Sequence, residues 1–244
     1  MKSDQLKKLW MLAFGDTEAV VSSFFFTAYA PQRCRYLTED GQITAALYWL
    51  DGECFGRKYA YIYGVATHPD HRGKGLCRKL MALTHADLKA LGYAGALLMP
   101  AELGLRKMYA SFGYRESSGI REFSCTAGEE SASVRPVSLS EYASLRRKFL
   151  PRGGLIQEGE NLAYLTTYAQ LYAGEDFLLT AVHEKDKLFG MELLGNADRA
   201  SQILKAMGYE EGTFRTPGKE IPFSMYYPLQ PDAPSPEYLG LAFD

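Results

Sequence analysis

The sequence predicts an α+β protein whose mixed sheet is flanked by helices. Two observations carry this prediction. Apolar residues alternate in short runs and recur at helical spacing in others, and the resulting elements run helix-helix-strand-strand-strand-helix-strand-helix-strand in the first half. A hydrophobic content of 47% over 244 residues is enough for one large or two modest cores.

Turn and cap residues set the ends of these elements. Gly15 ends the first helix, Asp16 or Thr17 caps the second, and Pro31 closes it. Glu39-Asp40-Gly41 is a hairpin turn, and Asp51-Gly52-Glu53 with Gly56 marks a loop. The expected ranges are helices 5–14, 17–29, 75–91 and 100–112, with strands 33–38, 42–50, 57–67, 93–99 and 114–125.

Residues 61–80 are the stretch around which the chain is organised. A strand ends at Pro69-Asp70, and an amphipathic helix follows. Alternation in the strand predicts that one set of side chains shares a face opposite the other set. The first set is Tyr61, Tyr63, Val65 and Thr67, and the second is Ile62, Gly64 and Ala66.

Between this strand and helix lies the basic glycine loop, Arg72-Gly73-Lys74-Gly75. Glycines let the backbone approach a ligand, and the N-terminus of the helix presents free N–H groups and positive dipole potential. These features predict an anion site suited to a pyrophosphate. The loop is neither a nucleotide P-loop nor a dinucleotide motif, because position 78, where the third glycine would stand, is Arg78.

The pattern Val65-Ala66-x-x-Pro69-x-x-Arg72-Gly73-x-Gly75-Leu76 resembles the acetyl-CoA signature of the GNAT N-acetyltransferase superfamily. The family's [RQ]-x-x-G-x-[GA] departs at its last position, which is Cys77 here. The resemblance covers about residues 1 to 127 and implies a mostly antiparallel mixed sheet with acetyl-CoA as co-substrate. It also implies that the pantetheine arm pairs with the backbone of Val65, Ala66 and Thr67, like an added strand. The pyrophosphate would meet the amides of Arg72, Gly73, Lys74, Gly75, Leu76 and Cys77.

The segment Tyr109-Ala110-Ser111-Phe112-Gly113-Tyr114 matches the family's Y-x-x-x-G-[FY] motif. Its tyrosine commonly serves as general acid, which makes Tyr109 the candidate catalytic residue. A phenol of pKa about 10 can protonate a departing thiolate whose conjugate acid has a pKa near 8.5. Cys77 is not expected to act as a nucleophile, because the family generally transfers directly.

The general base stays open on sequence grounds. The candidates are Glu53, Glu102, His68 and, carried by its apolar tail, the terminal carboxylate of Asp244. A water relay, or an amine that arrives partly neutral, would need no side-chain base. Asp51 and Glu53 could attract a cationic amine, and many aromatics lie near the expected cleft: Tyr29, Tyr36, Tyr48, Trp49, Tyr59, Tyr61 and Tyr63.

The second half reads as a degenerate copy of the first. Residues 98–114 align without gaps on residues 193–209, so that Tyr109 falls on Leu204, and the copy has no basic glycine loop. The predicted domains are a catalytic domain at 1–127, a degenerate GNAT-like domain at 128–230 and a Pro-rich tail at 231–244, with an extended first part and an apolar end that could dock. Expected elements in the copy are helices 139–150, 161–173 and 197–207, with strands 177–183, 187–194, 209–213 and 222–227.

Composition narrows the class of partner. A net charge of −2 gives no reason to expect nucleic acid or an anionic membrane, and the scattered cysteines favour free thiols without a metal site. The sequence thus predicts a cytoplasmic acetyl-CoA-dependent N-acetyltransferase acting on a primary amine, with a small molecule as acceptor. An acyl-CoA-binding pseudoenzyme and a protein N-acetyltransferase are the alternatives, and a homodimer stays open.

Overall fold

The computed structural model describes residues 2–243, which divide into two compact units. The first unit holds the chain up to Arg115, together with Gly159–Tyr164 and Met225–Ser235. The second unit holds Glu116–Glu158, Leu165–Ser224 and the chain from Pro236. These boundaries differ from the predicted 1–127, 128–230 and 231–244, because both units are assembled from separate stretches of the sequence.

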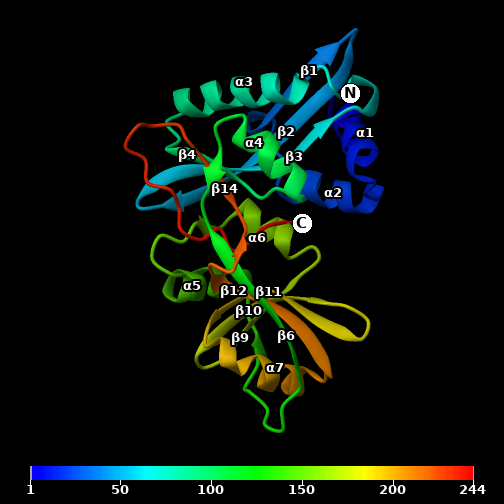
Figure 1. Ribbon diagram of the computed structural model, residues 1–244. Coiled ribbons are helices and arrows are strands. Elements are labelled where there is room, and N and C mark those ends of the chain that lie inside the picture. The colour runs from blue at the N-terminus through cyan, green and yellow to red at the C-terminus, as the bar shows by residue number, and fades with distance from the viewer. Residues whose placement is uncertain (1, 244) are drawn as a thin grey trace. The chain divides into compact units, whose positions relative to one another are not determined.

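The first unit is built on a mixed, mostly antiparallel sheet, as predicted. Its strands lie in the order β1-β2-β3-β4-β14 (Figure 1), with parallel pairing only between β3 and β4. The strands are β1 (Cys34–Glu39), β2 (Gln42–Cys54), β3 (Arg57–Thr67), β4 (Gly95–Leu98) and β14 (Met225–Pro228), and the short β5 (Arg115–Glu116) follows at the edge.

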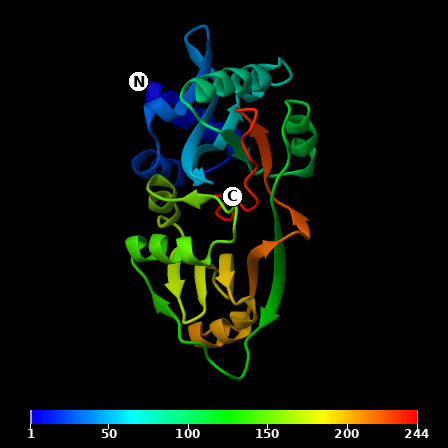
Figure 2. The same ribbon diagram turned by 90° about the vertical axis from the view of Figure 1, so that its left-hand side faces the viewer.

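Helices of the first unit pack on the two faces of this sheet (Figure 2). One face carries a core with Ile62 of β3 and Leu80 of α3, while Trp10 of α1 contacts Tyr48 and Tyr63 from the other. Thr17 caps α2 by accepting a hydrogen bond from the Val20 amide. The helices are α1 (Lys2–Phe14), α2 (Glu18–Thr27), α3 (Leu76–Ala90), α4 (Leu103–Ala110) and α6 (Glu160–Leu165).

Strand β14 completes the first unit from a remote part of the sequence. It runs antiparallel to β4, with Tyr226 opposite Leu97, and Met225 joins the core around α3. A Cβ placed on Gly95 would lie 2.2 Å from the Tyr226 ring, so β4 needs glycine there for β14 to pack. The predicted strand 222–227 therefore exists in part, but it belongs to the first sheet.

Three predicted elements were wrong in detail. The β2 strand continues through Asp51 to Cys54, so the turn before β3 is Phe55-Gly56. The expected helix 161–173 is α6 followed by strand β9. The expected final strand 114–125 divides into β5 and a strand, β6, that pairs with β12 in the second unit.

The second unit has its own mixed sheet, in the order β13-β6-β12-β11-β10-β9-β7. Helix α7 packs on the face that contains Leu179, and α5 packs on the face that contains Thr180. The elements are β6 (Gly119–Thr126), β7 (Arg135–Pro136), α5 (Leu139–Phe149), β8 (Ile156–Gln157), β9 (Gln170–Ala173), β10 (Phe177–His183), β11 (Lys187–Gly195), α7 (Ala200–Met207), β12 (Glu211–Gly218) and β13 (Ile221–Pro222).

The topology of the second unit repeats that of the first. In each, three antiparallel strands lead through one helix to a parallel neighbour, which an antiparallel strand then flanks. Helix α7 therefore corresponds to α3, and Leu204 is not the counterpart of Tyr109. The sequence alignment was misled by a shared helix ending, because Gly113 and Gly208 both have positive φ and the next amide bonds back to Tyr109 and Leu204, respectively.

The C-terminal segment is packed into the fold. Leu239 and Leu241 are fully buried, and the Gln157 side chain donates to the Leu241 carbonyl at 2.7 Å. The apolar end of the tail thus docks within the second unit, whereas Asp244 lies outside the described residues. Within residues 2–243, no helix is long and apolar enough to cross a bilayer.

Candidate functional site

A bulge in β3 shapes the site. Tyr63 lies opposite Tyr48 and Ala66 opposite Ala46, so Gly64 and Val65 together face one residue of β2. Gly64 has φ +58, and its Cα faces the rings of Trp10 and Tyr48, where an added Cβ would lie 3.0 Å from each. A bulge with a left-handed glycine bends the strand and shifts its alternation. Val65 therefore packs on the α3 face, and the predicted regular alternation through 61–67 was wrong.

The bent part of β3 is no longer paired with β4. Pairing with β4 joins Tyr59, Ala60 and Tyr61 to Gly95–Leu97, whereas β3 itself runs on to Thr67. On the other side, Ala66 and Thr67 stay paired with β2. The β4-facing edge at Val65, Ala66 and Thr67 is therefore the part of β3 to which an extended ligand can add backbone hydrogen bonds.

The basic glycine loop follows directly and is exposed. Gly73 and Gly75 both have φ +77, and a Cβ at either would point into open space. Helix α3 begins after Gly75 without a side-chain cap on its first amides within the described chain. Left-handed glycines at an uncapped helix start turn successive N–H groups toward one point, which is the geometry of an anion site.

Basic side chains in and after the loop have two different roles. Arg72 and Lys74 are exposed and have no carboxylate partner in the part of the chain that the structure describes, so they add positive potential. Arg78, one turn into α3, donates to both the Ser111 carbonyl and the Ser111 hydroxyl at 2.9 Å. That double contact fixes the end of α4 against the start of α3.

Tyr109 lies near the last turn of α4 and is 6% exposed. It contacts Phe112 and Tyr114, and burial, with a smaller effect of the nearby Cys77 thiol, raises its pKa. Its hydroxyl has no hydrogen-bond partner among residues 2–243. The fold thus brings together Tyr109 and Cys77 in the first turn of α3, which the sequence places 32 positions apart.

Cys77 is suited to packing. Burial raises the pKa of its thiol to about 11, so that it stays protonated near neutral pH. It packs with Leu76 against the core that contains Tyr109. That Cys77 does not act as a nucleophile stays a prediction.

The candidate bases do not gather around Tyr109. Glu53 of β2 lies opposite Lys58 of β3. Lys58 precedes the bulge at Gly64 by six residues, which is roughly 20 Å of strand. Glu102 is exposed at the start of α4, roughly 10 Å of helix from Tyr109. His68 accepts a hydrogen bond from the Asp70 amide at 3.3 Å. None of these contacts identifies a base.

Asp51 is not available to attract an amine. It accepts a hydrogen bond from Tyr93 and lies 3.1 Å from the Lys58 ammonium. The predicted aromatics split between different faces: Trp49 belongs to the α3 core, whereas Tyr29, Tyr48 and Tyr63 contact one another or the α1 and α2 aromatics.

A buried histidine supports the tyrosine cluster around Tyr109, and on sequence grounds it had no role beyond that of a solvent-facing or core residue. His85 of α3 is hydrogen bonded to Tyr114 at 2.8 Å and stacks on Tyr227 at 4.0 Å. Tyr114 in turn contacts Tyr109. A remote strand, β14, thus supports the end of α4, and only the fold could show this.

Burial lowers the pKa of His85 to about 4, from 6.5. The unfolded chain therefore binds a proton that the folded chain rejects between these values, and stability falls as pH drops through this range. We expect His85→Gln, which cannot titrate, to remove up to about 3 kcal/mol of acid destabilisation between pH 6.5 and 4. Urea unfolding across that range measures it, and an unchanged pH slope would contradict the assignment.

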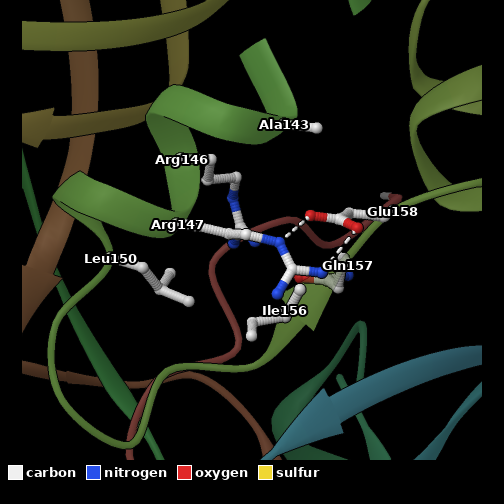
Figure 3. A pocket seen from close by; sticks show the side chains of 7 residues that line it. All are labelled: Ala143, Arg146, Arg147, Leu150, Ile156, Gln157 and Glu158. Carbon is white, nitrogen blue, oxygen red and sulfur yellow. Dashed lines mark hydrogen bonds and ion pairs between the residues drawn. The ribbon is translucent and has the colours of Figure 1, made fainter. Parts of the chain in front are cut away.

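A hollow in the second unit contains none of the predicted site residues. Figure 3 shows two of its lining residues paired with each other: Arg147 Nε and Nη2 donate to the two Glu158 oxygens at 2.6 and 2.8 Å. Leu150 and Ile156 lie among its lining residues. The Arg147 charge in this hollow is thus already paired with a carboxylate, so the hollow is not suited to bind an anion.

Comparisons with known proteins agree with this geometry. Residues 2–117 match the acetyltransferase (GNAT) domain family. A GCN5-related N-acetyltransferase from Kribbella flavida superposes with TM-score 0.68 at 18% identity, over 93% of this chain and 69% of that one. A protein of unknown function from Enterococcus faecalis, described as a probable N-acyltransferase, superposes with TM-score 0.69 at 16% identity. The superposition covers 93% of this chain and 70% of that one.

A tandem GNAT protein from the clavulanic acid biosynthesis pathway also shares the fold. It superposes with TM-score 0.55 at 10% identity, over 94% of this chain and 95% of that one. No sequence among the curated proteins matches significantly. Identities this low show the fold alone, whereas the family match covers the bulged strand, the basic glycine loop and Tyr109 together. Residues 2–117 thus form an acetyltransferase domain of the GNAT family.

Proposed function

We propose that the protein is an acetyl-CoA-dependent N-acetyltransferase that transfers the acetyl group directly to a primary amine of a small molecule in the cytoplasm. One observation carries the proposal: an uncapped helix start with two left-handed glycines stands beside an unpaired strand edge and a buried tyrosine. These are the parts needed to hold a diphosphate, an amide-bearing arm and a leaving thiolate. Four free cysteines fit a reducing compartment.

The residues fit acetyl-CoA because the open space at Gly73 and Gly75 exposes the loop amides. The amides of Gly73 to Cys77 would bind the pyrophosphate, with Arg72 and Lys74 adding charge. The edge of β3 at Val65, Ala66 and Thr67 would pair with the pantetheine amides. Acetyl-CoA supplies the activated thioester, and the chain orients it.

Tyr109 would act as the general acid. As the new N–C bond forms, the C–S bond breaks, and the thiolate takes the phenolic proton. The attacking nitrogen loses one proton to water, and Tyr109 recovers its proton from solvent. The raised pKa keeps Tyr109 protonated through neutral and mildly alkaline pH, as an acid must be.

The direct test measures binding and transfer separately. Calorimetry with acetyl-CoA reports the cofactor site, and release of free thiol in the presence of a panel of primary amines reports the reaction. Binding with transfer supports the proposal. Binding without transfer to any amine would favour a pseudoenzyme, and no binding would refute the site itself.

Gly75→Ala tests the loop. We expect about a tenfold weaker Kd for acetyl-CoA, because a Cβ at φ +77 strains the loop and points into the open space above the amides. Gly92→Ala is the matched control, since Gly92 has φ +82 and open space at the other end of α3. Calorimetry should show wild-type affinity for Gly92→Ala, and equal losses in both variants would contradict the prediction.

A further inference from the structure

The turn between α1 and α2 holds a carboxylate that does not cap the helix. Thr17 takes the capping position, and the Asp16 side chain turns back to accept a hydrogen bond from the Trp10 indole at 2.7 Å. Asp16 is half-buried and has no cationic partner among residues 2–243. One indole N–H uses only one of about four acceptor positions on a carboxylate. Asp16 therefore keeps most of its capacity to accept hydrogen bonds.

Trp10 links this carboxylate to the β3 bulge. One edge of the indole packs against Gly64, and its Nε1 donates to Asp16. The Trp10 indole thus lies between Asp16 and the bulge, where the pairing of β3 with β4 has ended. That bulge is also where the reacting end of a thioester would lie if its arm pairs with Val65, Ala66 and Thr67.

Other aromatic rings lie beside Trp10 and the β3 bulge. Tyr63, which precedes the bulge, contacts the Trp10 ring at 5.4 Å, and its hydroxyl lies 3.3 Å from that of Tyr164. Burial raises the pKa of Tyr164, the hydrogen bond with Tyr63 lowers it, and the nearby Asp16 carboxylate raises it by a smaller amount. Ring faces and a carboxylate are the two groups that bind organic ammonium ions in water.

Two other half-buried carboxylates of the first unit, Asp51 and Glu160, already have cationic partners. Lys58 lies 3.1 Å from Asp51, and Arg33 lies 3.4 Å from Glu160. The Lys7 ammonium donates to the Ser22 hydroxyl of α2 and lies over the Phe25 ring. The unpaired negative charge of Asp16 is thus not balanced by these neighbours.

We propose that Asp16, with Tyr63 and Tyr164, binds a second positive charge on the acceptor, so that the preferred substrates are small di- or polyamines. This rests on the proposed function, in which one amine attacks the thioester. That amine must be neutral, whereas the distal amine stays protonated and lies against the Asp16 carboxylate. The sequence assigned Asp16 only a capping role, which Thr17 performs instead.

The test compares 1,4-diaminobutane, 1,6-diaminohexane and 1,8-diaminooctane with 1-aminoalkanes of the same lengths, at saturating acetyl-CoA. We expect at least one diamine to exceed its monoamine in kcat/KM by ten- to hundredfold, as for a charge-assisted hydrogen bond. Asp16→Asn should abolish this difference through KM and leave the monoamine rates unchanged. Asparagine still accepts the Trp10 hydrogen bond, so the turn is retained.

Glu18→Gln is the matched control, because it removes an exposed carboxylate two residues away in the first turn of α2. It should preserve the preference for diamines. Equal wild-type kcat/KM for diamines and monoamines, or an equal loss of both in Asp16→Asn, would overturn the inference.

Calorimetry of the CoA-loaded protein separates this inference from the proposed function. If no amine is acetylated, the proposed function fails. The inference then stands only if 1,6-diaminohexane binds and 1-aminohexane does not, with that binding lost in Asp16→Asn. If amines are acetylated without a preference for diamines, the proposed function stands and the inference fails.

Discussion

Replacing Tyr109 with phenylalanine should lower kcat by roughly a hundredfold to ten-thousandfold, the usual contribution of a general acid. The loss is confined to kcat because the hydroxyl makes no hydrogen bond within residues 2–243, so its removal leaves the packing of α4 intact. Acetyl-CoA affinity should be unchanged, since the loop and the β3 edge are untouched. Single-turnover thiol release and calorimetry measure the two quantities.

Tyr114→Phe is the matched control, because it removes a phenol from the same cluster. Its hydroxyl is bound to His85, so we expect a loss of stability with kcat close to the wild-type value. The pH profile adds a second readout. A raised pKa keeps Tyr109 protonated as pH increases, so kcat of the wild-type enzyme should not fall through loss of this proton until the pH is above 10. Full turnover by Tyr109→Phe would exclude the assigned acid.

A chain that ends after residue 127 should not fold into a stable catalytic domain. It lacks β14, which pairs with β4 and places Met225 and Tyr227 against the core beside His85 and Tyr114. Losing a paired strand leaves apolar core surface and the β4 edge exposed to water. We expect it to aggregate or to lose its cooperative thermal transition, as followed by circular dichroism.

A point substitution tests the same contact in the full chain. Gly95→Ala places a Cβ 2.2 Å from the Tyr226 ring and should destabilise the fold by about 1–3 kcal/mol, as for an overpacked core. Gly104→Ala, inside α4 with open space around it, should instead stabilise by about 0.5–1 kcal/mol. A cooperative transition in the 1–127 chain, or no loss in Gly95→Ala, would show that β14 is dispensable.

Local chemistry in the sequence was sufficient for most elements and for the parts of the site. Gly75 and the apolar stripe after it predicted an anion-binding helix start, and the Tyr109 motif predicted the end of α4. These signals are short-range, since caps, left-handed glycines and helical periodicity act within a few residues. Gly64 carried a usable signal as well, because a glycine inside a strand pattern indicates a bulge.

The sequence alone therefore determined the order of the elements as far as α4, the basic glycine loop and the choice of Tyr109 as candidate acid. Only the tertiary structure decided that β14 joins β4, that Tyr227 supports His85 and Tyr114, and that α7 corresponds to α3. It also decided that Asp16 bonds to Trp10 next to the bulge instead of capping α2. Strand pairing and core contacts join residues far apart in the chain, and their choice depends on complementary surfaces that no local pattern records.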